Sequence, residues 1–62
     1  MYTKYVELRD KAQVKDFEVA KATGIPSSTF SDWKKGKSKP KLEKLSKIAK
    51  FFGVSVEVFI GE

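Results

Sequence analysis

Residues 20–36, which read AKATGIPSSTFSDWKKG, contain the two helical patterns that decide the fold. The two patterns are separated by Gly24 and a few further residues. A glycine at this place is typical of a helix that closes on a left-handed residue before a sharp turn. After the turn, Phe30 and Trp33 are three residues apart and mark one buried stripe of a second helix. The stretch therefore predicts two short helices joined by a tight turn.

The second of these helices is predicted to run from Ser27 to Lys35, with Ser27 as its N-cap. The side of this helix opposite to the apolar stripe carries a different kind of side chain. Short hydroxyls and charged groups occupy that side, namely Ser27, Ser28, Ser31, Asp32 and Lys35. A helix with an apolar stripe on one side and short hydrogen-bonding groups on the other is suited to a DNA groove. The arrangement predicts a helix-turn-helix with residues 27–35 as its recognition helix.

The size and composition of the chain limit what it can be. Its 62 residues suffice for one small domain whose apolar core must hold the fold alone. The absence of cysteine and histidine excludes disulfides and the common zinc sites, and we expect no metal or cofactor. No apolar run approaches the roughly 20 residues that cross a bilayer, and the chain does not open like a signal peptide. We expect a single cytoplasmic domain over residues 1–62.

Positive charge is concentrated in one part of the chain. The net charge is +5, but residues 34–50 hold eight lysines against one acid, Glu43, which is +7 there and leaves −2 for the rest. The lysines from Lys44 onward are partly explained as a solvated helix face. Those of residues 34–41 crowd into a turn beside the predicted recognition helix. A basic block in this place indicates a polyanionic partner.

Two helices are predicted before the turn. The first covers about residues 3–12, with Thr3 capping its start. The second runs from Asp16 to about Thr23, because a carboxylate suits the free amides in the N-cap or first turn of a helix. Phe17, the residue after this aspartate, is expected to be partly buried.

Two more helices are predicted after the recognition helix. One opens near Ser38 or Pro40 and carries the strongest helical periodicity in the chain. Its apolar residues are Leu42, Leu45, Ile48, Ala49 and Phe52. Ser55 then caps a short last helix, although the β-branched residues around Phe59 leave a strand as the alternative for this tail. The fold class predicted is all-α, a compact bundle of five helices.

With these residues assembled, the sequence resembles the phage repressor/Cro-type helix-turn-helix family, the xenobiotic-response-element class. Three features in order carry the resemblance: A-x-x-x-G-I at residues 20–25, Trp33-x-x-Gly36, and I-A-x-x-x-G-V-S at residues 48–55. The resemblance covers nearly the whole chain. It implies a compact lambda-repressor-like DNA-binding domain of five helices, with the second and third as the DNA-reading unit.

The resemblance also implies roles for individual residues. The base edges would be faced by Ser27, Ser28 and Asp32. The groove wall or the phosphates would be met by Asp16, Thr29, Ser31, Lys34, Lys35, Lys37 and Lys39. The core that supports the recognition helix would include Ala20, Gly24, Ile25, Phe30 and Trp33.

The chain departs from the family pattern at three places. Lys34 and Lys35 stand where many members carry Glu-Asn, which makes the turn more basic. Asp32 replaces a longer Arg or Gln, and beside phosphates it would need the amino group of a cytosine as its donor. Asp16 replaces a Gln that touches DNA in many members. For both aspartates a purely structural role stays open beside the DNA-binding one.

The leading hypothesis is sequence-specific binding of double-stranded DNA by a phage-repressor-like transcriptional regulator. A homodimer on a two-fold-symmetric operator is expected, with Val56, Val58 and Ile60 as candidate contacts. The alternative is a protein-interaction module on the same fold, of the antitoxin or antirepressor type, whose positive face would dock an acidic protein. An enzyme is not expected, since the acids are scattered and no serine lies in a nucleophile-elbow pattern. Neither a membrane nor a small molecule is expected as a partner.

Overall fold

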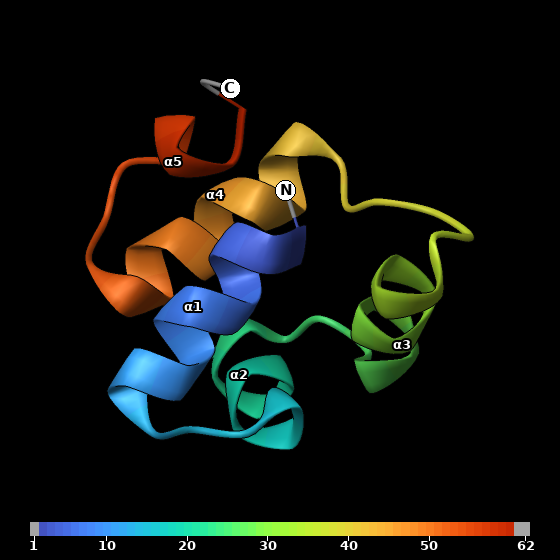
Figure 1. Ribbon diagram of the computed structural model, residues 1–62, viewed down its shortest axis with the longest axis horizontal. Helices are drawn as coiled ribbons and strands as arrows, with labels where there is room; N and C mark the ends of the chain where they lie inside the picture. Colours follow the sequence, from blue (N-terminus) through green and yellow to red (C-terminus); the bar gives the residue numbers. More distant parts are fainter. Residues whose placement is uncertain (1, 61–62) are drawn as a thin grey trace.

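The computed structural model describes residues 2–60 and places them in five α-helices (Figure 1). They are α1 (Tyr2–Ala12), α2 (Asp16–Thr23), α3 (Ser27–Lys35), α4 (Leu42–Phe52) and α5 (Glu57–Ile60). The described residues contain no strand, so the all-α prediction is confirmed and the tail forms a helix. Within the same range, every helix is too short or too polar to cross a membrane.

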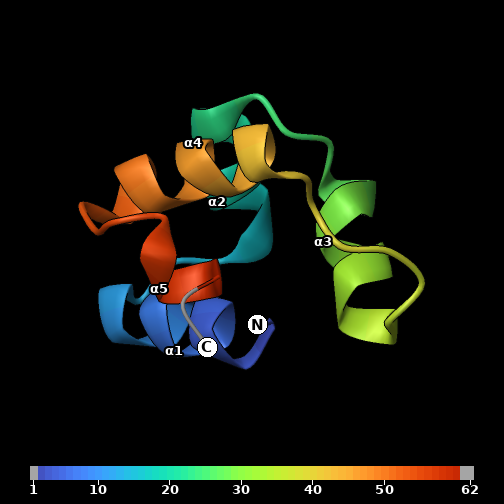
Figure 2. The ribbon, with the colours of Figure 1, turned by 90° about the horizontal axis from the view of Figure 1, so that it is seen from above.

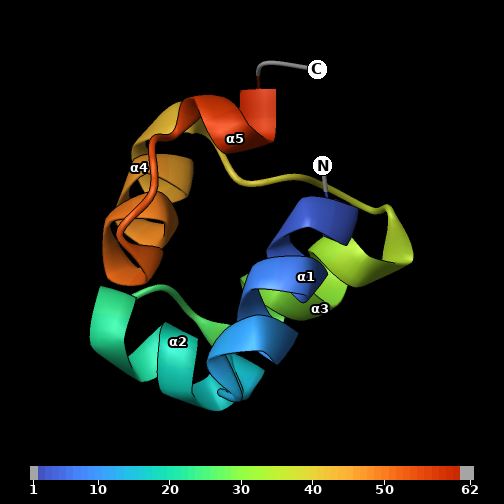
Figure 3. The same ribbon diagram turned by 60° about the vertical axis from the view of Figure 1, so that its left-hand side comes forward.

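The helix α3 lies at one edge of the molecule (Figures 1 and 2). Helix α2 packs against both α3 and α4, while α1 packs against α5. Figure 3 shows α2 and α4 together on one side of the molecule and α3 on the other. One side of α3 therefore meets the rest of the protein, and its other side is left open.

A single hydrophobic core connects the five helices. Each helix contributes one of the largest fully buried side chains: Tyr5, Val19, Phe30, Ile48 and Phe59. The ring of Tyr5 is central among the aromatic groups, with its centroid 5.2 Å from that of Phe30 and 5.2 Å from that of Trp33. Aromatic pairs at such distances add stability beyond the apolar area they bury. This cluster fixes α3 to α1.

Gly24 and Gly36 close α2 and α3 as predicted. Their φ angles are 77° and 75°, a left-handed conformation that is costly for residues with a Cβ. The amide of Gly24 donates to the carbonyl of Ala20 at 2.8 Å, which ends α2 and turns the chain toward α3. Helix α1 ends in the same conformation at Gln13, with a φ of 57° and no glycine to signal it.

Two of the predicted N-caps are wrong. Thr3 lies inside α1, which includes Tyr2 before it. Pro26 rather than Ser27 is the N-cap of α3, and no side-chain hydrogen bond caps this helix. The hydroxyl of Ser27 is therefore not used in capping. The predicted cap Ser55 is confirmed, because its Oγ accepts a hydrogen bond from the first backbone amide of α5 at 3.2 Å.

Two apolar side chains are more exposed than predicted: Phe17 was expected to be partly buried and Leu42 to belong to the apolar stripe of α4. Phe17 is 63% exposed and Leu42 is 58% exposed. The inner face of α2 is taken by Val19 and Ala20, whereas Phe17, in the first turn of this helix, stays outside the core. Helix α4 begins at Leu42, two residues after Pro40, and Leu42 lies in its first turn at the margin of the core.

Candidate nucleic-acid interface

The inner side of α3 is anchored in the core by Phe30 and Trp33, as the sequence predicted. Ala20 and Ile25, also predicted to support this helix, are buried in the same core. Gly24 is exposed, so it contributes to the position of α3 through the backbone turn and not through packing. The recognition helix is thus held from one side only.

The outer side of α3 holds most of the predicted contact residues. Ser27, Ser28, Ser31, Lys34 and Lys35 are exposed, and Thr29 and Asp32 are half-buried. Within residues 2–60, none of these side chains forms a hydrogen bond or an ion pair. The exposed five recur at positions i, i+1, i+4, i+7 and i+8, which places them along one helix face. Their donors and acceptors are available to a ligand.

The segment between α3 and α4 adds positive charge beside this face. Lys37 and Lys39 are exposed there, and the segment extends outward from the end of α3 (Figure 1). Pro40 is buried and anchors the far end of the segment. Lys37 and Lys39, together with the two lysines that end α3, form a cationic border along one end of the helix. Such a border attracts phosphate groups.

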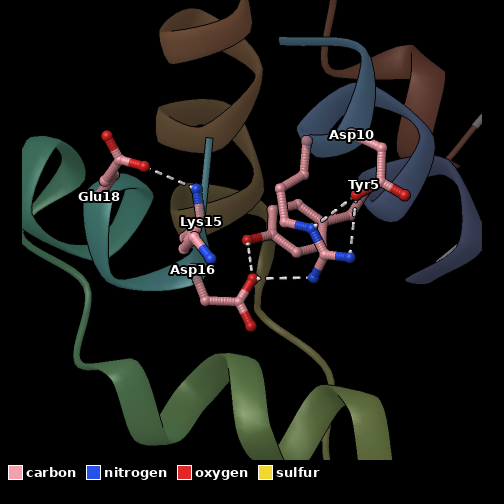
Figure 4. A network of polar contacts seen from close by, with 6 residues as sticks. Tyr5, Asp10, Lys15, Asp16 and Glu18 are labelled. Carbon is pink, nitrogen blue, oxygen red and sulfur yellow. Dashed lines mark hydrogen bonds and ion pairs between the residues drawn. The ribbon is translucent and has the colours of Figure 1, made fainter. Parts of the chain in front are cut away.

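Asp16 is held in a polar network between α1 and α2 (Figure 4). Its Oδ1 accepts a hydrogen bond from the hydroxyl of Tyr5 at 2.6 Å and one from Nη1 of Arg9 at 3.2 Å. Arg9 also donates to Oδ1 of Asp10, from Nε at 3.2 Å and from Nη2 at 3.1 Å. We call Tyr5, Arg9 and Asp16 the interhelix clamp. It joins α1 to the first residue of α2.

Both donors of the clamp have raised pKa values. Burial, followed by the hydrogen bond to Asp16, raises the pKa of the Tyr5 phenol well above its usual value. The hydrogen bond to Asp16 raises the pKa of the Arg9 guanidinium further above its already high value. Both groups therefore stay protonated and keep their hydrogen atoms available to Asp16 at physiological pH.

The interhelix clamp was not predicted from the sequence. Tyr5 and Arg9 are four residues apart, which places them on one face of α1. Nothing local in the sequence shows that this face meets Asp16, because only the packing of α1 against the start of α2 brings the three together. The available signal was a tyrosine at a core position with a charged residue one turn later.

The two aspartates left open by the sequence have different surroundings. Asp16 is in the first turn of α2, as expected, but the helix is capped by Glu18, whose carboxylate accepts from the backbone amide of Lys15 at 2.9 Å. Asp16 instead bonds to side chains of α1 and keeps part of its surface open to solvent. Asp32 is half-buried, and no described side chain binds it.

Residues 7–59 match a protein family described as helix-turn-helix. The chain is also 33% identical over 60 residues to a Vibrio cholerae protein named cryptic phage CTXphi transcriptional repressor RstR. That alignment covers 97% of this chain and 54% of the relative, so the chain spans about half the length of the curated relative it matches. No solved structure gives a significant match. The similarities are to a helix-turn-helix family and a repressor, and not to an enzyme.

Proposed function

Because the chain belongs to the helix-turn-helix family, we propose that it is a regulator of transcription that binds double-stranded DNA sequence-specifically and places α3 in the major groove. The observation that carries this proposal is the outer side of α3, where exposed hydroxyls and lysines without partners in residues 2–60 line one face. The similarity to a transcriptional repressor supports the same conclusion. We also propose that residues 1–62 form one domain, since a single core joins the five described helices.

The proposed contacts divide into positioning and reading. The phosphates and the groove wall would be met by Lys34, Lys35, Lys37, Lys39, Thr29 and Ser31. The base edges would be met by Ser27, Ser28 and Asp32. Hydroxyls on short side chains reach only bases that the helix approaches closely, so α3 must lie deep in the groove. Its anchoring by the aromatic core supplies the rigid placement that such a short reach needs.

The two aspartates receive different proposed roles. Asp32 has no partner among the described residues and would accept a hydrogen bond from the amino group of a cytosine, because the phosphates repel it. It would therefore reject sites that offer only acceptors at that position. Asp16 already accepts from two donors at Oδ1, so we assign it to positioning the start of α2 near DNA. It was predicted as a possible phosphate or groove contact, and the clamp favours the indirect role.

A homodimer is part of the proposal. Two recognition helices separated by about 34 Å fit successive major grooves on one face of DNA. Among the candidate contacts, Ile60 is 50% exposed, whereas Val56 and Val58 are half-buried and Val56 packs on the core. Ile60 is therefore the side chain best placed for a partner subunit.

Selection from a random duplex pool at near-physiological salt tests the proposal. We expect the retained sequences to share a two-fold-symmetric site whose half-sites are about one helical turn apart. Enrichment of a single half-site would support DNA reading but contradict the dimer. Retention without any enrichment, lost at modest salt, would contradict sequence-specific binding, because charge alone behaves in that way.

A further inference from the structure

Exposed aromatic side chains of α2 and α4 line one groove on the surface of the protein. Phe17 and Phe51, which are 63% and 38% exposed, border one groove. An adjoining hollow shares Ala22 and Phe51 with this groove and is lined also by Thr23, Lys47 and Lys50. We call this surface the aromatic groove, and its main lining residues are Val14, Phe17, Glu18, Lys21, Ala22 and Phe51.

The aromatic groove is separate from the outer side of α3. Helices α2 and α4 pack together, and Figure 3 shows them on the side of the molecule opposite to α3. Only at one end does the surface approach the recognition helix, where Phe17 also borders the turn from Gly24 to Ser27. Phe51 is at the other end, in the last turn of α4. The proposed contacts with DNA therefore give no role to the exposed ring of Phe51.

The two rings are suited to an apolar anchor. Phe51 packs edge-on against Phe52, with their centroids 4.9 Å apart and an interplanar angle of 80°. This contact restricts the orientation of Phe51 before any partner binds. Burial of exposed aromatic surface is favourable, and aromatic residues are enriched at the centres of protein interfaces. A pre-oriented ring also loses less conformational entropy on binding.

The charges around the groove select the partner. Three lysines line it, Lys21, Lys47 and Lys50, and none of them pairs with a carboxylate within residues 2–60. The one acid in the lining is Glu18, and its carboxylate accepts from the backbone at the start of α2. The groove thus combines an apolar centre with a positive border.

We propose that the aromatic groove docks an acidic amphipathic segment of another protein. An apolar side chain of that segment inserts between Phe17 and Phe51, and its carboxylates meet the three lysines. A nucleic acid backbone would use the lysines but not the apolar rings. A second copy of this chain would bring the same lysines face to face in a symmetric contact, which like charges oppose. The inference does not depend on the proposed DNA binding.

Peptide binding to the isotope-labelled whole chain, followed by amide chemical shifts, tests the inference. Three synthetic helical peptides share two leucines one turn apart and differ only in carrying Glu, Gln or Lys at the flanking positions. We expect saturable binding in the order Glu, Gln, Lys, with shifts confined to α2 and the last turns of α4. Phe51→Ala should weaken the Glu peptide at least about tenfold, as expected for a central interface residue.

Leu42→Ala is the matched control, since it removes another exposed apolar side chain at the opposite end of α4. It should leave the affinity for the Glu peptide unchanged, and the spectra of both variants report directly whether the fold persists. Absence of saturable binding would overturn the inference, as would equal affinities of Phe51→Ala and the unaltered chain. Shifts centred on Lys34 to Lys39 would show binding by charge alone. Concentration-dependent shifts in the groove without peptide would make a second copy the occupant.

Discussion

The two sides of α3 are built from the same nine residues but have opposite environments. On the inner side, Phe30 and Trp33 are enclosed by the core and lie against the ring of Tyr5. On the outer side, Ser28 and Ser31 are exposed and have no partner among the described residues. The inner side decides where the helix lies, because its packing contributes to folding. The outer side contributes little to folding, so its residues are free to determine what the helix binds.

Trp33→Ala tests the role of the inner side of α3 and is expected to have the largest effect on stability. Truncation of a buried aromatic side chain should lower the free energy of unfolding by about 3–5 kcal/mol. In a domain of this size such a loss removes most of the stability. Urea unfolding measures the change, and Ser31→Ala on the outer side should stay within about 0.5 kcal/mol of the unaltered chain. Similar urea midpoints for Trp33→Ala and Ser31→Ala would show that the two sides of α3 do not differ in their contribution to stability.

Tyr5→Phe should have a smaller effect on stability. The variant keeps the ring in the core but removes the hydrogen bond to Asp16, which should cost about 1 kcal/mol at neutral pH. Chemical unfolding of both proteins measures it. An unchanged free energy of unfolding would show that the interhelix clamp does not stabilise the start of α2.

The same pair of proteins predicts a dependence on pH. The pKa of Tyr5 is raised in the folded state, so the folded protein retains this proton above the unfolded pKa of about 10. The contribution of this raised pKa to the free energy of unfolding is complete below that pH. The contribution is lost as the pH rises further, because the unfolded state then releases a proton that the folded state keeps. We expect the free energy of unfolding, measured from pH 8 to about 11, to be higher for the unaltered chain than for Tyr5→Phe. This difference should narrow above pH 10. A constant difference between the two proteins over this range would contradict the raised pKa of Tyr5.

Much of the difference between the two sides of α3 could be predicted, because it depends on residues that are close together in the sequence. The spacing of Phe30 and Trp33 indicated the inner side of α3. Gly24 marked the end of α2, and Gly36 marked the end of α3. The interhelix clamp could not be predicted, because it forms only where α1 meets α2. The exposure of Phe17 has the same origin, since an apolar residue at the first turn of a helix is buried only if a neighbouring element covers it. Gln13 ends α1 without the residue type that normally signals such an end.

On the outer side, Ser28→Ala is expected to change base preference and not stability. Loss of one hydroxyl contact should reduce discrimination at a single base position by about 1 kcal/mol. Binding to the selected duplex and to its single-base variants measures this change. An equal loss of affinity for every duplex would show that Ser28 does not read a base.

Lys37→Ala should give the smallest change in specificity. A lysine that contacts phosphate holds the protein on any duplex, so its loss should weaken all sequences alike. The slope of log affinity against log salt should fall in magnitude by about one. A salt titration on two unrelated duplexes measures both effects. If Lys37→Ala instead altered base preference as Ser28→Ala should, the division between positioning and reading would be wrong.

The most direct test of the outer side is amide chemical-shift mapping with a selected duplex added to the labelled chain. We expect the largest changes from Ser27 to Lys39, which cover the outer side of α3 and the basic segment after it. Amides in the last turn of α4, near Phe51, should change little. Changes concentrated around Phe51, with the amides of α3 unaffected, would contradict the claim that α3 presents the DNA-binding surface.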